Sequence, residues 1–160
     1  MAPNAGYVLE SAVIPADLNA VWNLIKPMTF KFSKSISQAK REEGEEVGSL
    51  GQFTVAYADN TVQTLRITEI SERLPTKRSI GMEFVSSDPA VTYSSRMDQI
   101  IISSVTHGNS PGVFIEYSSD FSSDVSNAVL EDNKYKKREF FDDLMAFCGS
   151  AEPSAKKQKA

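Results

Sequence analysis

The chain has very little cysteine and histidine. Cys148 is the only cysteine and His107 the only histidine among its 160 residues. A single cysteine excludes an intrachain disulfide framework and a multi-cysteine metal site, and it is typical of a reducing compartment. His107 stands in a turn next to Gly108 without an identifiable orienting partner, so the sequence predicts no Ser-His-Asp or Cys-His catalytic arrangement. We expect His107 to be exposed and Cys148 to act as a small core group.

Long hydrophobic runs, glycine-rich phosphate loops and metal-ligand spacings are also missing. No stretch approaches the roughly 20 apolar residues of a membrane-spanning helix, and residues 1–6 lack the basic start and apolar run of a signal peptide. The net charge is −4, and residues 1–149 are more acidic still because the final segment holds three lysines. Such a domain repels phosphate backbones. We therefore expect a cytoplasmic monomer with no cofactor, no metal ion, no nucleic-acid partner and no stable membrane insertion.

Alternation of apolar and polar residues predicts seven strands. Most candidates are separated by hairpin turns, which indicates a largely antiparallel meander and excludes a doubly wound fold. The strands are expected at residues 7–14, 36–41, 52–57, 62–70, 78–85, 93–105 and 113–121, the run 93–105 being the longest. The composition fits one domain, over residues 1–149.

Helices are expected at two places. Asp17 is a plausible N-cap for a short helix that ends near Lys26, before Pro27. A long helix is expected to begin near Ser123 or Asp124 and to end at Gly149. Its second half carries a wide apolar stripe, whereas residues 131–139 are polar apart from Tyr135. Residues 28–37 could form a short helix, a loop or a weak strand, and residues 150–160 are expected to form a disordered basic tail.

Several segments resemble the helix-grip (SRPBCC) superfamily, which includes the birch pollen allergen, START domains and polyketide cyclase-like proteins. The matching segments are residues 11–22 with the Val21-Trp22 pair, 47–53, 65–73 and 114–121. The resemblance implies an α+β fold in which a curved seven-stranded antiparallel sheet wraps around a long C-terminal helix, with one or two short helices after the first strand. It also implies a cavity between sheet and helix. The chain departs from the pattern at Gly51, where some enzymatic relatives carry an arginine.

If the most apolar strand faces point inward, they line this cavity. The expected lining residues are Phe53, Val55, Leu65, Ile67, Ile80, Met82, Phe84, Met97, Phe140 and Leu144, with Tyr93, Ser95, Gln99 and Glu116 as polar candidates. The alternative is that the apolar residues simply fill the core. Strand alternation turns Glu116 outward if Ile115 and Tyr117 face inward, whereas the resemblance allows the comparable glutamate to face the pocket.

Three functions follow from these expectations. The first is binding or transport of a hydrophobic small molecule, such as a lipid, a sterol or a polyketide-like compound. The second is a cyclase, dehydratase or isomerase that uses Glu116 as a base together with Tyr93. The third is a protein-interaction module with a filled core and an exposed apolar patch at Phe30 and Phe32. In the first reading, Phe30 and Phe32 would instead form a lid at the cavity mouth.

Overall fold

The computed structural model describes residues 6–42 and 49–157, with side chains up to Gly149. Its elements confirm the predicted seven strands, short helix and long C-terminal helix. They are β1 (Gly6–Ile14), α1 (Leu18–Ile25), β2 (Ile36–Arg41), β3 (Gly51–Tyr57), β4 (Val62–Ser71), β5 (Lys77–Asp88), β6 (Arg96–Val105), β7 (Gly112–Phe121) and α2 (Asn127–Lys157). The sequence also predicts an acidic turn at residues 42–46, of which only Glu42 lies within the described residues.

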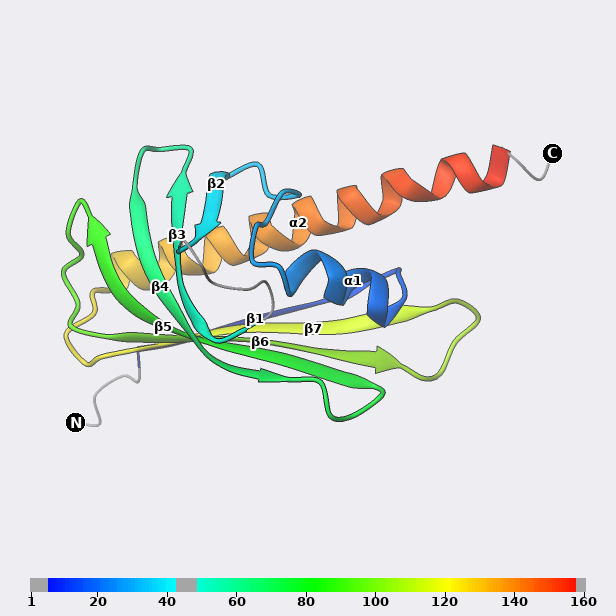
Figure 1. Cartoon of the computed structure of the whole chain (residues 1–160), viewed down its shortest axis with the longest axis horizontal. Helices are drawn as coiled ribbons and strands as arrows, with labels where there is room; N and C mark the ends of the chain where they lie inside the picture. Colours follow the sequence, from blue (N-terminus) through cyan, green and yellow to red (C-terminus); the bar gives the residue numbers. More distant parts are fainter. Residues whose placement is uncertain (1–5, 43–48, 158–160) are drawn as a thin grey trace.

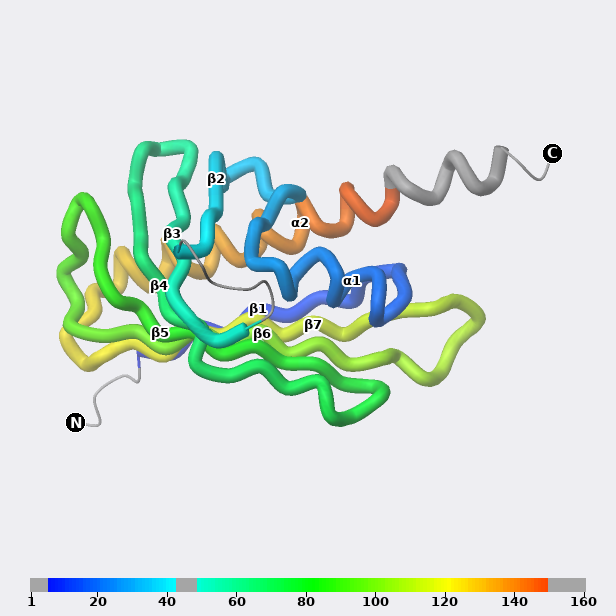
Figure 2. The backbone as a smooth tube through the Cα atoms, in the orientation of Figure 1, coloured from blue at the N-terminus to red at the C-terminus, as the bar shows by residue number. Residues whose placement is uncertain are grey.

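The seven strands form one antiparallel sheet in the order β1-β7-β6-β5-β4-β3-β2. The sheet curves around α2, and both helices lie on its concave side (Figure 1). Two register shifts in the β4–β5 pair favour this curvature, because a bulge bends its strand and increases the local twist. The chain passes from β1 through α1 to β2, and these two strands form the opposite edges of the sheet (Figure 2).

The short helix forms as its sequence predicts. The Asp17 side chain accepts a hydrogen bond from the backbone N–H of Asn19 at 3.1 Å, which caps the first turn. The helix buries one face and contributes Leu18, Val21, Trp22 and Ile25 to the core. Trp22 Nε1 donates to Glu72, whose carboxylate also pairs with Lys26, so the helix is fastened to the end of β4.

The segment between α1 and β2 is a loop, which resolves the three possibilities left by its sequence. Met28 and Phe30 adopt positive φ angles of 56° and 48°. This conformation is uncommon for bulky residues and needs support from the surrounding packing. Phe30 and Phe32 supply that packing, because both are buried and both rings contact Phe140 of α2.

Several element ends differ from the prediction. Strand β6 begins at Arg96, so the longest strand is β5, with 12 residues. Helix α2 begins at Asn127, where Ser126 Oγ accepts a hydrogen bond from the N–H of Val129 at 3.3 Å. Asp124 does not cap the helix, because its carboxylate accepts from Ser94 and Ser122. The helix continues to Lys157, beyond the predicted end at Gly149, and the separate basic tail stays a prediction.

The main core lies between the sheet, α1 and the second half of α2, and Leu144 is fully buried in it. Leu144→Ala is expected to lower the free energy of unfolding by about 2–5 kcal/mol, because it leaves a cavity that the rigid sheet cannot fill. Urea denaturation measures this change. The matched control is Leu74→Ala, a half-exposed leucine in the β4–β5 turn, for which we expect a loss below about 1 kcal/mol. Equal losses at the two positions would contradict this account of the core.

Candidate functional site

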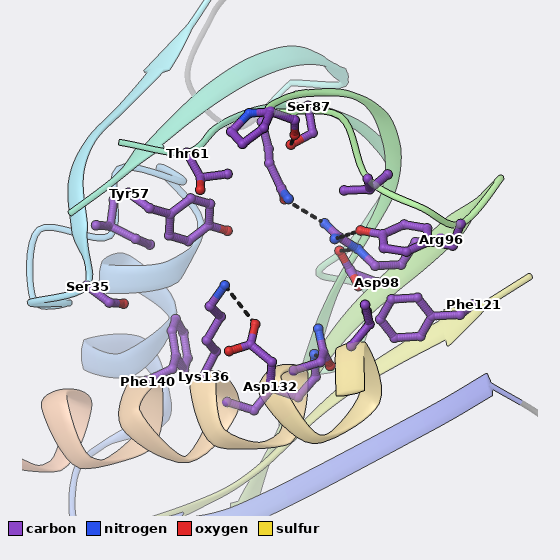
Figure 3. A pocket seen from close by; sticks show the side chains of 18 of the residues that line it. Ser35, Tyr57, Thr61, Ser87, Arg96, Asp98, Phe121, Asp132, Lys136 and Phe140 are labelled. Carbon is purple, nitrogen blue, oxygen red and sulfur yellow. Dashed lines mark hydrogen bonds and ion pairs between the residues drawn. The ribbon is translucent and has the colours of Figure 1, made fainter. Parts of the chain in front are cut away.

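A cavity of about 330 Å³ lies between the concave face of the sheet and the first half of α2. Its walls come from the loop before β2, the end of β3, the start of β4, the segment 87–93, and strands β6 and β7. Figure 3 shows Tyr57 on one side of it, Arg96 and Asp98 on the other, and Lys136 and Asp132 rising from α2. The volume is at the lower end of the range for small-molecule sites.

The polar stretch of α2 forms one wall of the cavity. The helix residues that line it are Val129, Asp132, Asn133, Lys136, Lys137 and Phe140. They recur at steps of three and one along the chain, which places them on a single face of the helix. The polarity of residues 131–139 therefore marks an inward face of the helix, and Tyr135, the aromatic residue of that stretch, is exposed.

Three lining residues belong to a hydrogen-bonded network, which we call the buried network: Arg96, Asp98 and Lys137, joined by Ser119. Arg96 Nε donates to Asp98 Oδ2 at 3.0 Å, Ser119 Oγ donates to Asp98 Oδ1, and Lys137 Nζ donates to Ser119 Oγ at 2.6 Å. Arg96, Asp98 and Lys137 are only 7%, 5% and 3% exposed. Such depth is rare for charged side chains unless they are paired.

Arg96 is positioned by three further neighbours. Its Nη1 donates to Tyr93 Oη at 2.6 Å, its Nη2 donates to Gln63 Oε1 at 3.2 Å, and its guanidinium carbon lies 5.1 Å from the centre of the Phe84 ring. The planar guanidinium suits several directed hydrogen bonds and stacking on a ring at the same time. Arg96 is therefore fixed in one orientation toward the cavity.

Lys137 is fixed from the helix side. Its Nζ donates to Asn133 Oδ1 at 2.7 Å, one turn earlier in α2, and lies 4.1 Å from the centre of the Tyr117 ring. Burial lowers the pKa of Lys137 to about 8, because a charged ammonium loses its hydration there; Arg96 also lowers this pKa, whereas Asp98 and Glu10 raise it. The lysine thus titrates close to neutral pH.

Two tyrosines present hydroxyls to the same space. Burial raises the pKa of Tyr57 to about 12 and that of Tyr117 well above its usual value, so both stay protonated at neutral pH. Within the described part of the chain, neither hydroxyl makes a hydrogen bond. Lys136 lies 5.5 Å from the centre of the Tyr57 ring and pairs with Asp132 at 3.0 Å.

The cavity wall also has an apolar part, which adjoins Arg96: Tyr93 accepts a hydrogen bond from Arg96, and Phe121 is its pairing partner in β7. A second core cluster forms there from Val8, Tyr93 and Phe121, and Val91 and Val129 pack against it. Phe121, Val91 and Val129 also line the cavity. The site therefore combines a charged, hydrogen-bonding part with an apolar part next to it, which is the arrangement that an amphipathic ligand requires.

The expected lining residues lie in different places. Tyr93 and Phe140 line the cavity. The other apolar candidates lie in the core and outside the lining: Phe30, Phe53, Val55, Leu65, Ile67, Ile80, Met82, Phe84 and Leu144. In this part of the sheet, the inward apolar residues pack against α1 and against the turns of α2 around Phe140 and Leu144. Packing therefore fills the space beside them.

Three polar candidates and Met97 also lie outside the lining. Met97 is 48% exposed, which corrects its expected inward position: Arg96 and Asp98, on either side of it, occupy the inner face of β6. Glu116 lies on the face of β7 opposite to that of Ile115. Ser95 is exposed and Gln99 is partly buried.

Three site residues were not predicted, although the same periodicities indicate them: Arg96, Asp98 and Lys137. Arg96 and Asp98 alternate in step with the buried Ile100 and Ile102, so a strand through all four turns them to the same face. Lys137 precedes Phe140, Phe141 and Leu144 by three, four and seven residues, which is the spacing of one helical face. Charged residues that share a strand face or a helix face with core residues thus indicate a buried polar site.

Four other residues named in the sequence-based predictions lie outside the cavity lining: Phe30, Phe32, His107 and Cys148. Phe30 and Phe32 are 4% and 7% exposed, so they form neither an exposed patch nor part of the cavity lining; their rings instead pack on each other and on Phe140. His107 is exposed, as expected, and Cys148 is partly buried beside the core. Among the described residues, no cluster of potential metal ligands occurs, and neither helix is long and apolar enough to cross a membrane.

Solved structures of the same architecture are known, although no protein-family model matches the sequence and no curated protein matches it. A protein of Nitrosospira multiformis has a TM-score of 0.73 and 20% identity over 88% of this chain and 94% of its own. An uncharacterized protein of Bacillus thuringiensis has a TM-score of 0.71 and 15% identity, over 89% and 98%. A START superfamily protein of Mycobacterium smegmatis has a TM-score of 0.67 and 10% identity, over 91% and 98%. The chain therefore has the helix-grip fold, which it shares with a member of the START superfamily.

Proposed function

We propose that this protein binds a small amphipathic molecule in the cavity between the sheet and the first half of α2. The observation that carries the proposal is the cavity itself, whose wall combines fixed polar groups with an adjoining apolar part. A fold that needed α2 only for packing would place apolar residues along its whole inward face, as the turns around Phe140, Phe141 and Leu144 do. The first half instead places Lys137, Asn133 and Lys136 on its inward face.

The nature of the wall refines the expected ligand. A wholly apolar lining would suit a hydrocarbon-like molecule. Here such a ligand would leave fixed hydrogen-bond donors and acceptors of the wall without partners. A molecule with an apolar body and a polar head satisfies both the polar and the apolar part of the wall. Among the alternatives, catalysis by Glu116 has no support in the geometry, because Glu116 is outside the lining.

Native mass spectrometry of the purified protein tests the proposal, with gentle denaturation to release and identify any bound compound. We expect a co-purifying small molecule or, for protein stripped of it, a rise in melting temperature on adding it back. Val129→Trp, which fills the apolar part of the cavity, is expected to abolish both effects, and Ala128→Trp, at an exposed neighbour outside the lining, is expected to preserve them. Equal binding by the two variants would place the ligand elsewhere and overturn the proposal.

A further inference from the structure

The charges that line the cavity do not balance. Three cationic side chains, Arg96, Lys136 and Lys137, face two carboxylates, Asp98 and Asp132. Lys136 and Asp132 pair with each other near solvent, where an ion pair costs little. In the buried network, therefore, the single carboxylate of Asp98 is the counter-ion for two cations, Arg96 and Lys137. The excess is positive although the whole protein carries a net charge of −4.

Neighbouring charged groups leave this excess in place. Glu10 of β1 lies close enough to Lys137 to affect its pKa, but its carboxylate pairs with Arg138 at 3.2 Å. Arg96 and Asp98 of β6 also act on Lys137, whereas Lys136 and Asp132, the other charged residues of the lining, pair with each other. A buried charge without a counter-ion is costly, so this arrangement is favoured when an anion completes it.

Donors remain for such an anion. Lys137 has three N–H groups and donates to two oxygens, and Arg96 has five N–H groups and donates to three. The hydroxyls of Tyr57 and Tyr117 make no hydrogen bond within the described part of the chain and stay protonated, so they are further donors. The polar part of the cavity wall thus offers many donors, and its one buried carboxylate, that of Asp98, already accepts hydrogen bonds from Arg96 and Ser119.

We propose that the ligand carries a carboxylate that binds beside Lys137 and neutralises the excess positive charge of the buried network. This inference rests on the proposed function and adds the chemical class of the ligand, a small carboxylic acid with an apolar body. A single negative charge matches the single excess cation. The apolar body extends toward Phe121, Val91 and Val129, which form the apolar part of the cavity wall.

Matched pairs of probe compounds test whether the cavity prefers a negatively charged ligand, and they do not require the natural ligand to be known. Each pair consists of an aromatic or aliphatic acid and its amide of the same shape, for example 2-naphthoic acid and 2-naphthamide, with affinities measured by calorimetry at pH 7. In the pairs that bind most tightly, we expect the acid to bind at least tenfold more tightly than its amide. Lys137→Met is expected to remove this preference. Lys134→Met, one turn away and outside the lining, removes the same charge and is expected to retain the preference.

A second readout uses the unaltered protein. Because burial lowers the pKa of Lys137 to about 8, a bound carboxylate would raise that pKa again and the complex would take up protons near pH 8. Calorimetry in two buffers with different ionisation enthalpies measures this uptake, which we expect for the acids and not for the amides.

The outcomes separate the two proposals. Amides that bind as tightly as their acids, or acids that bind without proton uptake near pH 8, would overturn the carboxylate inference and leave the proposed function standing. If no member of any pair binds, and no small molecule accompanies the purified protein, both are overturned. An acid preference that survives Lys137→Met would overturn the assignment of Lys137 as the group that holds the anion.

Discussion

Asp98→Asn is expected to lower the free energy of unfolding by about 3–5 kcal/mol, because it leaves two buried cations without a counter-ion. Asp98 accepts hydrogen bonds from Arg96 and Ser119, and through Ser119 it is linked to Lys137. Asparagine has nearly the same shape, so the loss would reflect charge and not volume. Urea denaturation at neutral pH, with ligand removed, measures the change.

Two further variants make this prediction specific. Asp120→Asn changes an exposed aspartate of β7 and is expected to alter the free energy of unfolding by less than about 0.5 kcal/mol. The double variant Arg96→Met with Asp98→Asn removes the unpaired guanidinium and should recover part of the loss, which would appear as a coupling between the two positions. A loss below about 1 kcal/mol for Asp98→Asn, or strict additivity in the double variant, would show that the carboxylate does not hold the buried network together.

The second large effect is a dependence of stability on pH. The free energy of unfolding of the wild-type protein, relative to that of Lys137→Met, is expected to rise by about 2–3 kcal/mol between pH 7 and pH 10. Burial lowers the pKa of Lys137 from the ordinary 10.5 to about 8 in the folded protein. Between these values the unfolded chain still binds the lysine proton while the folded protein has released it, so raising the pH favours the folded state.

The comparison with Lys137→Met isolates this lysine. Burial raises the pKa values of Tyr57 and Tyr117, so these tyrosines destabilise the fold only above about pH 10, where an exposed phenol begins to ionise. Both proteins contain them, and their contribution cancels in the difference. Unfolding curves at pH 7, 8, 9 and 10 give the profile. A difference that stays constant across this range would mean that Lys137 keeps its ordinary pKa and is not desolvated.

Most of the architecture could be predicted from the sequence because it depends on local signals. Period-two alternation in segments such as Phe53 to Tyr57 gave the strands, and the spacing of Leu18, Val21, Trp22 and Ile25 gave the short helix. The limits of the elements depend on tertiary contacts instead. Asp124 has the chemistry of an N-cap, yet it bonds to Ser94 from another loop, so α2 begins three residues later.

The cavity was harder to predict, because the residues expected to line it were chosen for being apolar. In a curved sheet the apolar inward side chains are those that meet a helix, and Phe53 and Ile67 are therefore buried in the core. The inner face of β6 becomes polar where the cavity opens, at Arg96 and Asp98, and Met97 is turned to the outside. Strand register predicts which residues share a face, but only the packed structure shows which of those faces are filled.

The division of α2 into two halves has a consequence for how this protein can change. The turns that border the cavity, from Val129 to Lys137, are largely separate from the turns that anchor the core around Phe141 and Leu144. Substitutions in the first set can alter the chemistry of the bound molecule, while the second set continues to specify the fold. Ligand specificity and fold stability therefore depend on two consecutive stretches of the same helix. Related proteins can acquire new ligands through substitutions in the first stretch with little loss of stability.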